Sequence, residues 1–146
     1  MKRNGFLIGG LAAGCLILSA GPVAADGAVA IGVPKNVVKE GVAQGYSIRA
    51  KTREDARKVA MAYCTDVKKS SKAAVALCKV VQDFHDQCVA FALDPEPGTP
   101  GYGWGLGPDK AGAEKVALTM CYGNAGANRH DFCKAMASDC DGTANK

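Results

Sequence analysis

Two stretches of this chain decide its fold: TREDARKVAMAYC at residues 52–64 and DKAGAEKVALTMC at residues 109–121. Each begins with a residue whose side-chain oxygen can cap a helix, and each ends on a cysteine. Each also repeats small and apolar residues at the i, i+3, i+4, i+7, i+8 spacing of one buried helical stripe. The expected buried positions are Ala56, Val59, Ala60, Tyr63 and Cys64 in the first helix, and Ala113, Val116, Ala117, Met120 and Cys121 in the second. One helix-plus-cysteine unit therefore occurs twice.

The segments around both helices have the pattern of strands. We expect strands at residues 28–33, 42–48 and 78–84 around the first helix, and at 88–93, 101–106 and 132–137 around the second. Pro34 and Pro95 each follow the first strand of a unit, as expected where a ladder donor is lost. The order is thus β-β-α-β twice, with repeat one at about residues 27–84 and repeat two at about 88–140. We expect one α+β domain over residues 26–146, with two helices packed on a largely antiparallel sheet.

The first 25 residues have the pattern of a signal peptide. Lys2 and Arg3 precede an apolar stretch over residues 6–20, and we expect cleavage after Ala25. The stretch is too short and too rich in glycine for a membrane-spanning helix, which needs about 20 apolar residues. An alternative is a lipoprotein anchored through Cys15, because LAAGC at residues 11–15 faintly resembles a lipobox. The sequence predicts a periplasmic or secreted protein, with the lipoprotein as the alternative.

Charge and hydropathy narrow the partners of the exported chain. Removal of residues 1–25 leaves 121 of the 146 residues and lowers the formal net charge from +4 to +2, because Lys2 and Arg3 are lost. This charge is too mild for nucleic-acid binding, which needs a concentrated basic surface. No later stretch is long and apolar enough to span a membrane. The expected partner is a protein or a cell-envelope component.

Six of the seven cysteines remain when Cys15 leaves with the signal peptide. An even number of cysteines in a small exported chain predicts disulfides. The chain has no C-x-x-C pair, so we expect no zinc site and no cofactor. If the two repeats are equivalent, Cys64–Cys78 and Cys121–Cys133 are equivalent bridges that tie a helix to the following strand. Cys88–Cys140 is then the remaining pair.

These residues resemble a family of exported bacterial proteins known as domain of unknown function 4189. The resemblance covers roughly residues 28–140. It rests on the A-x-x-x-A-x-x-x-C pattern of both helices, on CKVV at 78–81, on CVAFA at 88–92 and on GWG at 103–105. Because that family carries no assigned activity, the resemblance implies a fold and export, and no chemistry.

The two histidines of the chain each precede an aspartate and lie three residues before a cysteine, as His85-Asp86 and His130-Asp131. This local pattern aligns Cys88 with Cys133, whereas the helices align Cys78 with Cys133. We favour the helix-based alignment, because it matches two caps, two stripes and two cysteines at once. A histidine oriented by a carboxylate can bind a metal ion or act as a general base. The structural interpretation, which we favour, places both pairs in turns before strands.

The stretch GYGWGLG at residues 101–107 alternates glycine with bulky residues. In a strand this pattern puts Tyr102, Trp104 and Leu106 on one face and bare glycine on the other. The glycine face can admit a close neighbour, and the aromatic face can bind a sugar or a peptide. Because the chain has few aromatic residues, we favour a place in the core for these side chains over a binding role.

We expect no catalytic residues, and we favour a non-catalytic binding module for a protein or an envelope component. Two alternatives stay open. The first is an inhibitor or immunity protein that inserts the loop at residues 84–87 into an exported enzyme. The second is a metal-dependent hydrolase that uses His85, His130 and nearby carboxylates.

Overall fold

The computed structural model describes residues 26–66, 68 and 70–145. The predicted signal peptide, its cleavage site after Ala25 and the alternative lipid anchor at Cys15 lie outside these residues. The nearly complete description of the remaining chain allows the predicted repeats to be compared element by element.

Both repeats have the expected β-β-α-β order. Thr52 and Asp109 cap their helices, since their side chains accept hydrogen bonds from the backbone N–H groups of Asp55 at 3.1 Å and Gly112 at 2.7 Å. Repeat one consists of β1 (Asp26–Gly32), β2 (Ala43–Ala50), α2 (Arg53–Cys64) and β3 (Lys79–His85). Repeat two consists of β4 (Cys88–Leu93), β5 (Tyr102–Gly107), α4 (Lys110–Ala125) and β6 (Lys134–Cys140). The short α1 (Val37–Glu40), α3 (Lys72–Val75), η1 (Ala127–Phe132) and η2 (Gly142–Asn145) lie in the connections and at the C-terminal end.

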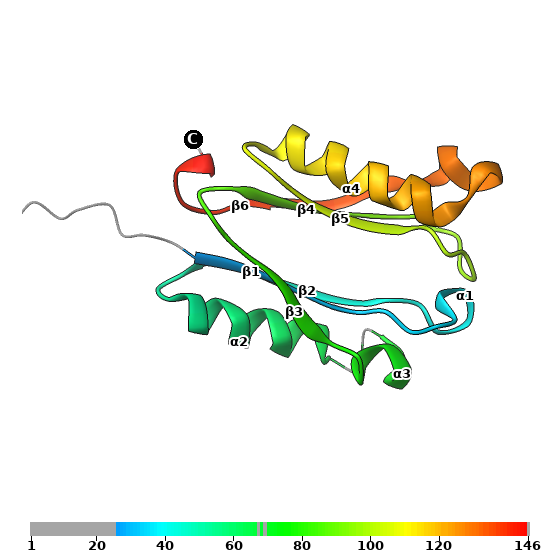
Figure 1. Cartoon of the computed structure of the whole chain (residues 1–146), viewed down its shortest axis with the longest axis horizontal. Helices are drawn as coiled ribbons and strands as arrows, with labels where there is room; N and C mark the ends of the chain where they lie inside the picture. The colour runs from blue at the N-terminus through cyan, green and yellow to red at the C-terminus, as the bar shows by residue number, and fades with distance from the viewer. Residues whose placement is uncertain (1–25, 67, 69, 146) are drawn as a thin grey trace, which may run out of the picture.

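The antiparallel strands form two sheets of three strands, with the orders β2-β1-β3 and β5-β4-β6, where a single sheet was expected. Figure 1 shows the two sheets facing each other, with α2 on the outside of one and α4 on the outside of the other. Each helix therefore covers the outer face of its own sheet, and the inner faces cover one another. The α+β class is confirmed, and the physical reason for the division is that each three-stranded unit needs both of its apolar faces covered.

The strand registers confirm the helix-based alignment of the repeats. Lys79, just after Cys78, pairs with Ile31 of β1, and Lys134, just after Cys133, pairs with Leu93 of β4. Both pairings shift by one residue at the same place, between Val29 and Ala30 in β1 and between Phe91 and Ala92 in β4. Apart from this shift, each residue pair of β1 and β3 has an equivalent pair in β4 and β6.

The buried stripe of each helix is narrower than its sequence predicts. The alanines and the cysteine at i, i+4 and i+8 are buried, but Val59 and Tyr63 of α2 are 41% and 54% exposed. Val116 and Met120 of α4 are 47% and 37% exposed, so the expectation was wrong at the same places in both repeats. The cause is close packing on glycine. A Cβ atom on Gly45 of β2 would lie 2.3 Å from the carbonyl oxygen of Ala60.

The space between the two sheets holds the largest apolar side chains. Val29, Ile31 and Phe84 from the first sheet pack with Val89 and Phe91 from the second, and all five are buried. Because the two helices face away from this layer, the sheets alone set its width. At the open edges of this layer, the side chains of the outermost strands therefore decide how much space is left between the sheets.

Three disulfides join the predicted pairs, Cys64–Cys78, Cys88–Cys140 and Cys121–Cys133. The first and third connect a helix to the start of the next strand, as the repeat implied; Cys64 ends α2, whereas α4 continues for one turn past Cys121 to Ala125. The last strand begins later than expected, at Lys134, because Phe132 belongs to the 3₁₀ helix η1.

Candidate functional site

The two His-Asp pairs lie at opposite ends of β4. His85 ends β3, next to Cys88 at the start of β4, whereas His130 lies in η1, before Lys134, which pairs with Leu93 at the end of β4. Six strand residues at about 3.3 Å each separate the two ends. Among the described residues, no three His, Cys, Asp or Glu side chains form a group that could hold a metal ion. The histidine constellation that a metal hydrolase would require is therefore not assembled.

His85 lies between two carboxylates. Its Nδ1 atom is 3.6 Å from Oδ1 of Asp26, and its Nε2 atom is 3.2 Å from Oδ2 of Asp86. Asp86 has a left-handed backbone with φ of 51°, in the tight connection between β3 and β4. His85 is thus the last residue of β3, where its side chain is 46% exposed, and Asp86 alone lies in the turn, whereas the structural interpretation expected both residues in a turn.

His130 has a different environment. Its ring packs on the ring of Tyr122 in α4, with centroids 4.5 Å apart, and Asp131 beside it is exposed. His130 precedes Cys133 in the connection to β6, whereas His85 follows Cys78 at the far end of β3. The two His-Asp pairs therefore occupy positions that are not equivalent in the two repeats.

The aligned registers place the Asp26–His85 contact where repeat two has a disulfide. Asp26 pairs with His85 across β1 and β3, and Cys88 pairs with Cys140 across β4 and β6, at the same step of the two ladders. A side-chain contact in one repeat thus stands where the other has a covalent link. We regard the side chains of His85 and Asp26 as a structural clasp at the open end of the first sheet.

A buried aspartate joins the two repeats close to this clasp. The Asp141 side chain is fully buried, and its Oδ1 atom accepts a hydrogen bond of 2.7 Å from the backbone N–H of Arg49 at the end of β2. Arg49 has φ of 57°, and the N–H of Asp141 donates to the carbonyl of Gln87 at 2.9 Å. Among the described residues, the Oδ2 atom of Asp141 has no hydrogen-bond partner. These contacts tie the end of β2 and the connection between β3 and β4 to the residue that follows β6.

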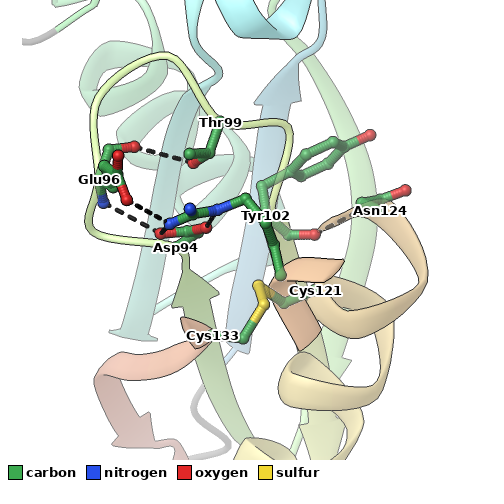
Figure 2. Close-up of a disulfide and its surroundings, with 8 residues drawn as sticks. Asp94, Glu96, Thr99, Tyr102, Cys121, Asn124 and Cys133 are labelled. Atoms are coloured by element: carbon green, nitrogen blue, oxygen red, sulfur yellow. Dashed lines mark hydrogen bonds and ion pairs between the residues drawn. A yellow bond between two sulfur atoms is a disulfide. The ribbon is translucent and has the colours of Figure 1, made fainter. Parts of the chain in front are cut away.

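At the opposite end of β4, an ion pair fixes the loop between β4 and β5. Figure 2 shows Asp94, Glu96 and Thr99 of this loop beside the Cys121–Cys133 disulfide. The Nε atom of Arg129 is 2.5 Å from the buried carboxylate of Asp94, and its Nη2 atom is 2.6 Å from Glu96. The hydrogen bond from Arg129 holds the pKa of Asp94 below its usual range. This cluster is internally satisfied, which is typical of a structural support.

Two of the three bulky residues of β5 are partly buried and pack against the core. Trp104 and Leu106 pack against the buried layer between the sheets, while Gly103 and Gly105 face α4. Tyr102 is half-buried, and its carbonyl accepts a hydrogen bond of 2.8 Å from Asn124 (Figure 2). A binding role for Tyr102 and Trp104 stays a prediction, since both are only half-buried and Tyr102 lines a hollow beside the loop between β4 and β5.

A groove of about 510 Å³ lies where the edge of β2 meets β6. It is lined by five consecutive residues of β2, by two of α2, by one of β4 and by two of β6. These residues are Gln44, Gly45, Tyr46, Ser47, Ile48, Val59, Tyr63, Phe91, Ala137 and Asp139. Its volume lies within the roughly 300–1,000 Å³ typical of ligand sites. We take this groove as the candidate functional site.

One difference between the repeats helps to open the groove. Phe84 of β3 pairs with Gly27, and its ring fills the space above that glycine, since a Cβ on Gly27 would lie 2.2 Å from it. The equivalent positions in repeat two are Asp139 of β6 and Val89 of β4. A short carboxylate therefore stands where the first repeat has a buried ring, and the layer between the sheets is left open below β2.

Aromatic side chains and one carboxylate set the character of the groove. The rings of Tyr46 and Phe91 pack with their centroids 5.4 Å apart. Burial, the negative charge of Asp139 and the nearby Tyr63 together raise the pKa of Tyr46. Among the described lining residues, Asp139 is the one that is charged at neutral pH. The groove thus combines aromatic and aliphatic side chains with polar ones and carries a single formal negative charge.

Sequence reasoning missed this site for an identifiable reason. Val59 and Tyr63 were assigned to the buried stripe of α2, so they were not considered as surface residues. The available signal was the pair of glycines, Gly45 and Gly103, which indicates a helix lying too close to its strand for the i+3 and i+7 side chains to be covered. The absence of a large residue at Asp139 had no meaning before the strand register was known.

Comparison with known proteins supports the family assignment. No curated protein and no solved structure matches the chain. The sequence matches the family described as Domain of unknown function (DUF4189) over residues 27–140, which includes both repeats and all six paired cysteines. The chain therefore belongs to the DUF4189 family.

Proposed function

We propose that the protein is a non-catalytic binding module that holds a protein or a cell-envelope component in the groove between β2 and β6. The observation that carries this proposal is the groove itself, with Val59 and Tyr63 exposed on one wall and the Tyr46–Phe91 ring pair inside. Apolar and aromatic surface of this kind gains free energy when a partner removes it from water.

The cross-linked frame supports a binding role. Disulfides fix the end of α2 to β3 and the end of β6 to β4, so both walls of the groove are attached to covalently closed loops. A preorganised surface loses less conformational entropy when it binds than a mobile one does. The frame therefore favours recognition of a partner by a surface that is already formed.

The proposed compartment is the periplasm or the extracellular space. Disulfides persist in oxidising compartments and are rare in the cytosol, so the three bridges favour export. None of the helices in residues 26–66, 68 and 70–145 has the length and apolar character needed to cross a bilayer. A signal peptide cleaved after Ala25 is the proposed route, with a lipid anchor at Cys15 as its alternative.

Site-specific photocrosslinking tests the groove. A benzophenone amino acid at Tyr63 is expected to capture a discrete partner from an envelope extract, whereas the same group at Met120 of α4 is not. Met120 is the equivalent helix position in repeat two, so the pair separates the groove from general stickiness. Equal crosslinking at both positions, or turnover of a substrate that survives substitution in the groove, would contradict the proposal.

An inhibitor or immunity protein is a second candidate, because His85 is exposed beside the tight turn between β3 and β4. Asp86 holds its positive φ, and Gln87 is tied to Asp141 through its carbonyl. Phe84 is buried and cannot enter an enzyme, so the contact would depend on His85 and Asp86. An inhibition constant that stays the same in a His85→Ala variant would end this hypothesis.

A further inference from the structure

β2 is an edge strand whose outer backbone lies along the groove. Among the described strands, β2 pairs with β1 alone, and its pairing from Ala43 to Ser47 is regular. The residues 43–48 carry no charge. Lysines, bulges and charged pairs are the usual devices that keep an edge strand from pairing with another chain. This part of β2 has none of them, whereas β3 and β6 both contain a register shift and a lysine. The fourth edge strand, β5, is also uncharged and regular, but none of its residues lines this groove.

We propose that the groove binds an extended segment of another polypeptide, which adds to the edge of β2 as a fourth strand and places a basic side chain over Asp139. This inference rests on the proposed function, because it names the chemistry of the partner that the same groove would hold. Strand addition of this kind obtains affinity from main-chain hydrogen bonds and specificity from the pockets that receive alternate side chains.

The lining of the groove matches the needs of an added strand. Five consecutive residues, Gln44 to Ile48, line it, so the groove follows the strand along its edge and is not confined to one face. Every second residue of an edge strand directs its N–H and C=O groups away from its single neighbour. These groups would pair with the backbone of the incoming segment along about five residues, or roughly 17 Å.

The two walls would receive alternate side chains of that segment. On the outer side the half-exposed Val59 and Tyr63 of α2 form an apolar wall. On the inner side Ala137 and Asp139 of β6 form the floor, next to the Tyr46–Phe91 ring pair. Since successive side chains of a strand point to opposite faces, an apolar residue would meet α2 and its neighbour would meet β6.

The charge of Asp139 decides which side chain of the added segment fits against β6. Asp139 is partly buried, and its Oδ1 atom accepts a hydrogen bond of 3.0 Å from the N–H of Cys140. Asp139 lines the groove together with Tyr46, whose pKa is raised by burial first and by the charge of Asp139 second. The described lining has no cation to balance this charge. A lysine or arginine of the partner would supply it, whereas a glutamate at the same place would be repelled.

A positional-scanning library of acetylated, amidated linear octapeptides tests the inference, with binding measured by fluorescence polarisation. We expect the tightest pools to combine one lysine or arginine with apolar residues at odd spacings from it. Replacement of that basic residue by glutamate should weaken binding at least tenfold. A preference for acidic peptides, or none for either charge, would overturn the inference.

Backbone methylation distinguishes strand addition from other binding. The best peptide is made with N-methyl groups on the odd residues or on the even residues. An added strand uses one of these sets, so one peptide should bind at least tenfold more weakly while the other stays close to the parent. Equal effects of the two methylated peptides would show that the segment does not extend the sheet, whatever its affinity.

Matched variants locate the contact. Val59→Lys should weaken peptide binding at least tenfold, and Val116→Lys, at the equivalent exposed position of α4, should not. Asp139→Asn should bring the affinities of the basic and acidic peptides within about threefold, with Asp131→Asn as the control. Thermal unfolding of each variant is measured to check that the fold is kept. A Val116→Lys effect as large as that of Val59→Lys would place the peptide elsewhere.

The crosslinking and peptide assays together distinguish a failure of this inference from a failure of the proposed function. If photocrosslinking at Tyr63 captures a partner but no peptide pool binds, the groove binds something other than an extended segment and the inference alone fails. If neither assay detects binding at the groove, both fail. If sedimentation shows a dimer that Val59→Lys disrupts and that peptides do not displace, the inference is likewise overturned.

Discussion

The equivalence of the Asp26–His85 contact and the Cys88–Cys140 disulfide predicts that a fourth disulfide can be built. In the double variant Asp26→Cys, His85→Cys, the new cysteines occupy directly paired positions of antiparallel strands. Paired Cα atoms in such strands are about 4.5–5.5 Å apart, and disulfides span about 4.4–6.8 Å. We therefore expect the bond to form during oxidative folding without backbone movement.

The stabilisation can be worked from the length of the closed loop. Residues 26 and 85 enclose a loop similar to the separation of 52 between Cys88 and Cys140, for which the chain-entropy model gives about 4 kcal/mol. The Cys64–Cys78 bridge already shortens the new loop, which lowers this value by about 0.2 kcal/mol. Loss of the half-exposed contact between Asp26 and His85 costs at most about 1 kcal/mol, the upper end for an exposed pair. The net gain in the free energy of unfolding is therefore about 3 kcal/mol.

Two measurements check this prediction. Mass spectrometry after alkylation under non-reducing conditions counts free thiols, and guanidinium unfolding gives the free energy. The single variant His85→Cys is the control; it should carry one thiol and lie within about 1 kcal/mol of the parent. Two free thiols in the folded double variant, or a bond from either new cysteine to one of the six native cysteines, would refute the proposed equivalence of the repeats.

Three further predictions concern the fold around the groove. Gly45→Ala should lower the free energy of unfolding by about 1–3 kcal/mol in chemical denaturation, because its Cβ would press on the Ala60 carbonyl. Thr52→Ala should lower it by about 1 kcal/mol in the same assay, through loss of the α2 cap. The pKa of Asp94 is lowered by Arg129, so the stability it contributes is complete above its unfolded pKa of about 3.9 and is lost as the pH falls through its folded pKa. Urea midpoints of the parent and of Arg129→Gln should therefore differ at pH 7 and converge below about pH 4; a constant difference would contradict this assignment.

Several features of the structure could be predicted from the sequence, because they depend on interactions over a few residues. The helix starts at Thr52 and Asp109 follow from a side-chain oxygen and a backbone N–H three residues later. The order of strands and helices along the chain follows from the spacing of apolar residues around each helix. The disulfide pairing followed from the repeat, since equivalent cysteines must close equivalent links.

The functional expectations were less informative, because they depended on which residues meet across the fold. The two His-Asp pairs look alike in the sequence, yet the strand registers place them at opposite ends of β4. Their similarity is therefore local. No feature of the sequence around Asp139 indicated a site, since its meaning depends on the position that Phe84 occupies in the other repeat.

The sequence by itself determined the duplicated β-β-α-β order, the helix caps and the cysteine pairs, because each of these follows from short-range spacing or from the repeat. The tertiary structure alone decided that the strands divide into two sheets and that Val59 and Tyr63 stay exposed. It also decided that a groove opens between β2 and β6. The physical reason is packing: glycine brings each helix so close to its strand that only a narrow stripe is covered, and the gap between the sheets depends on side chains that meet only after folding.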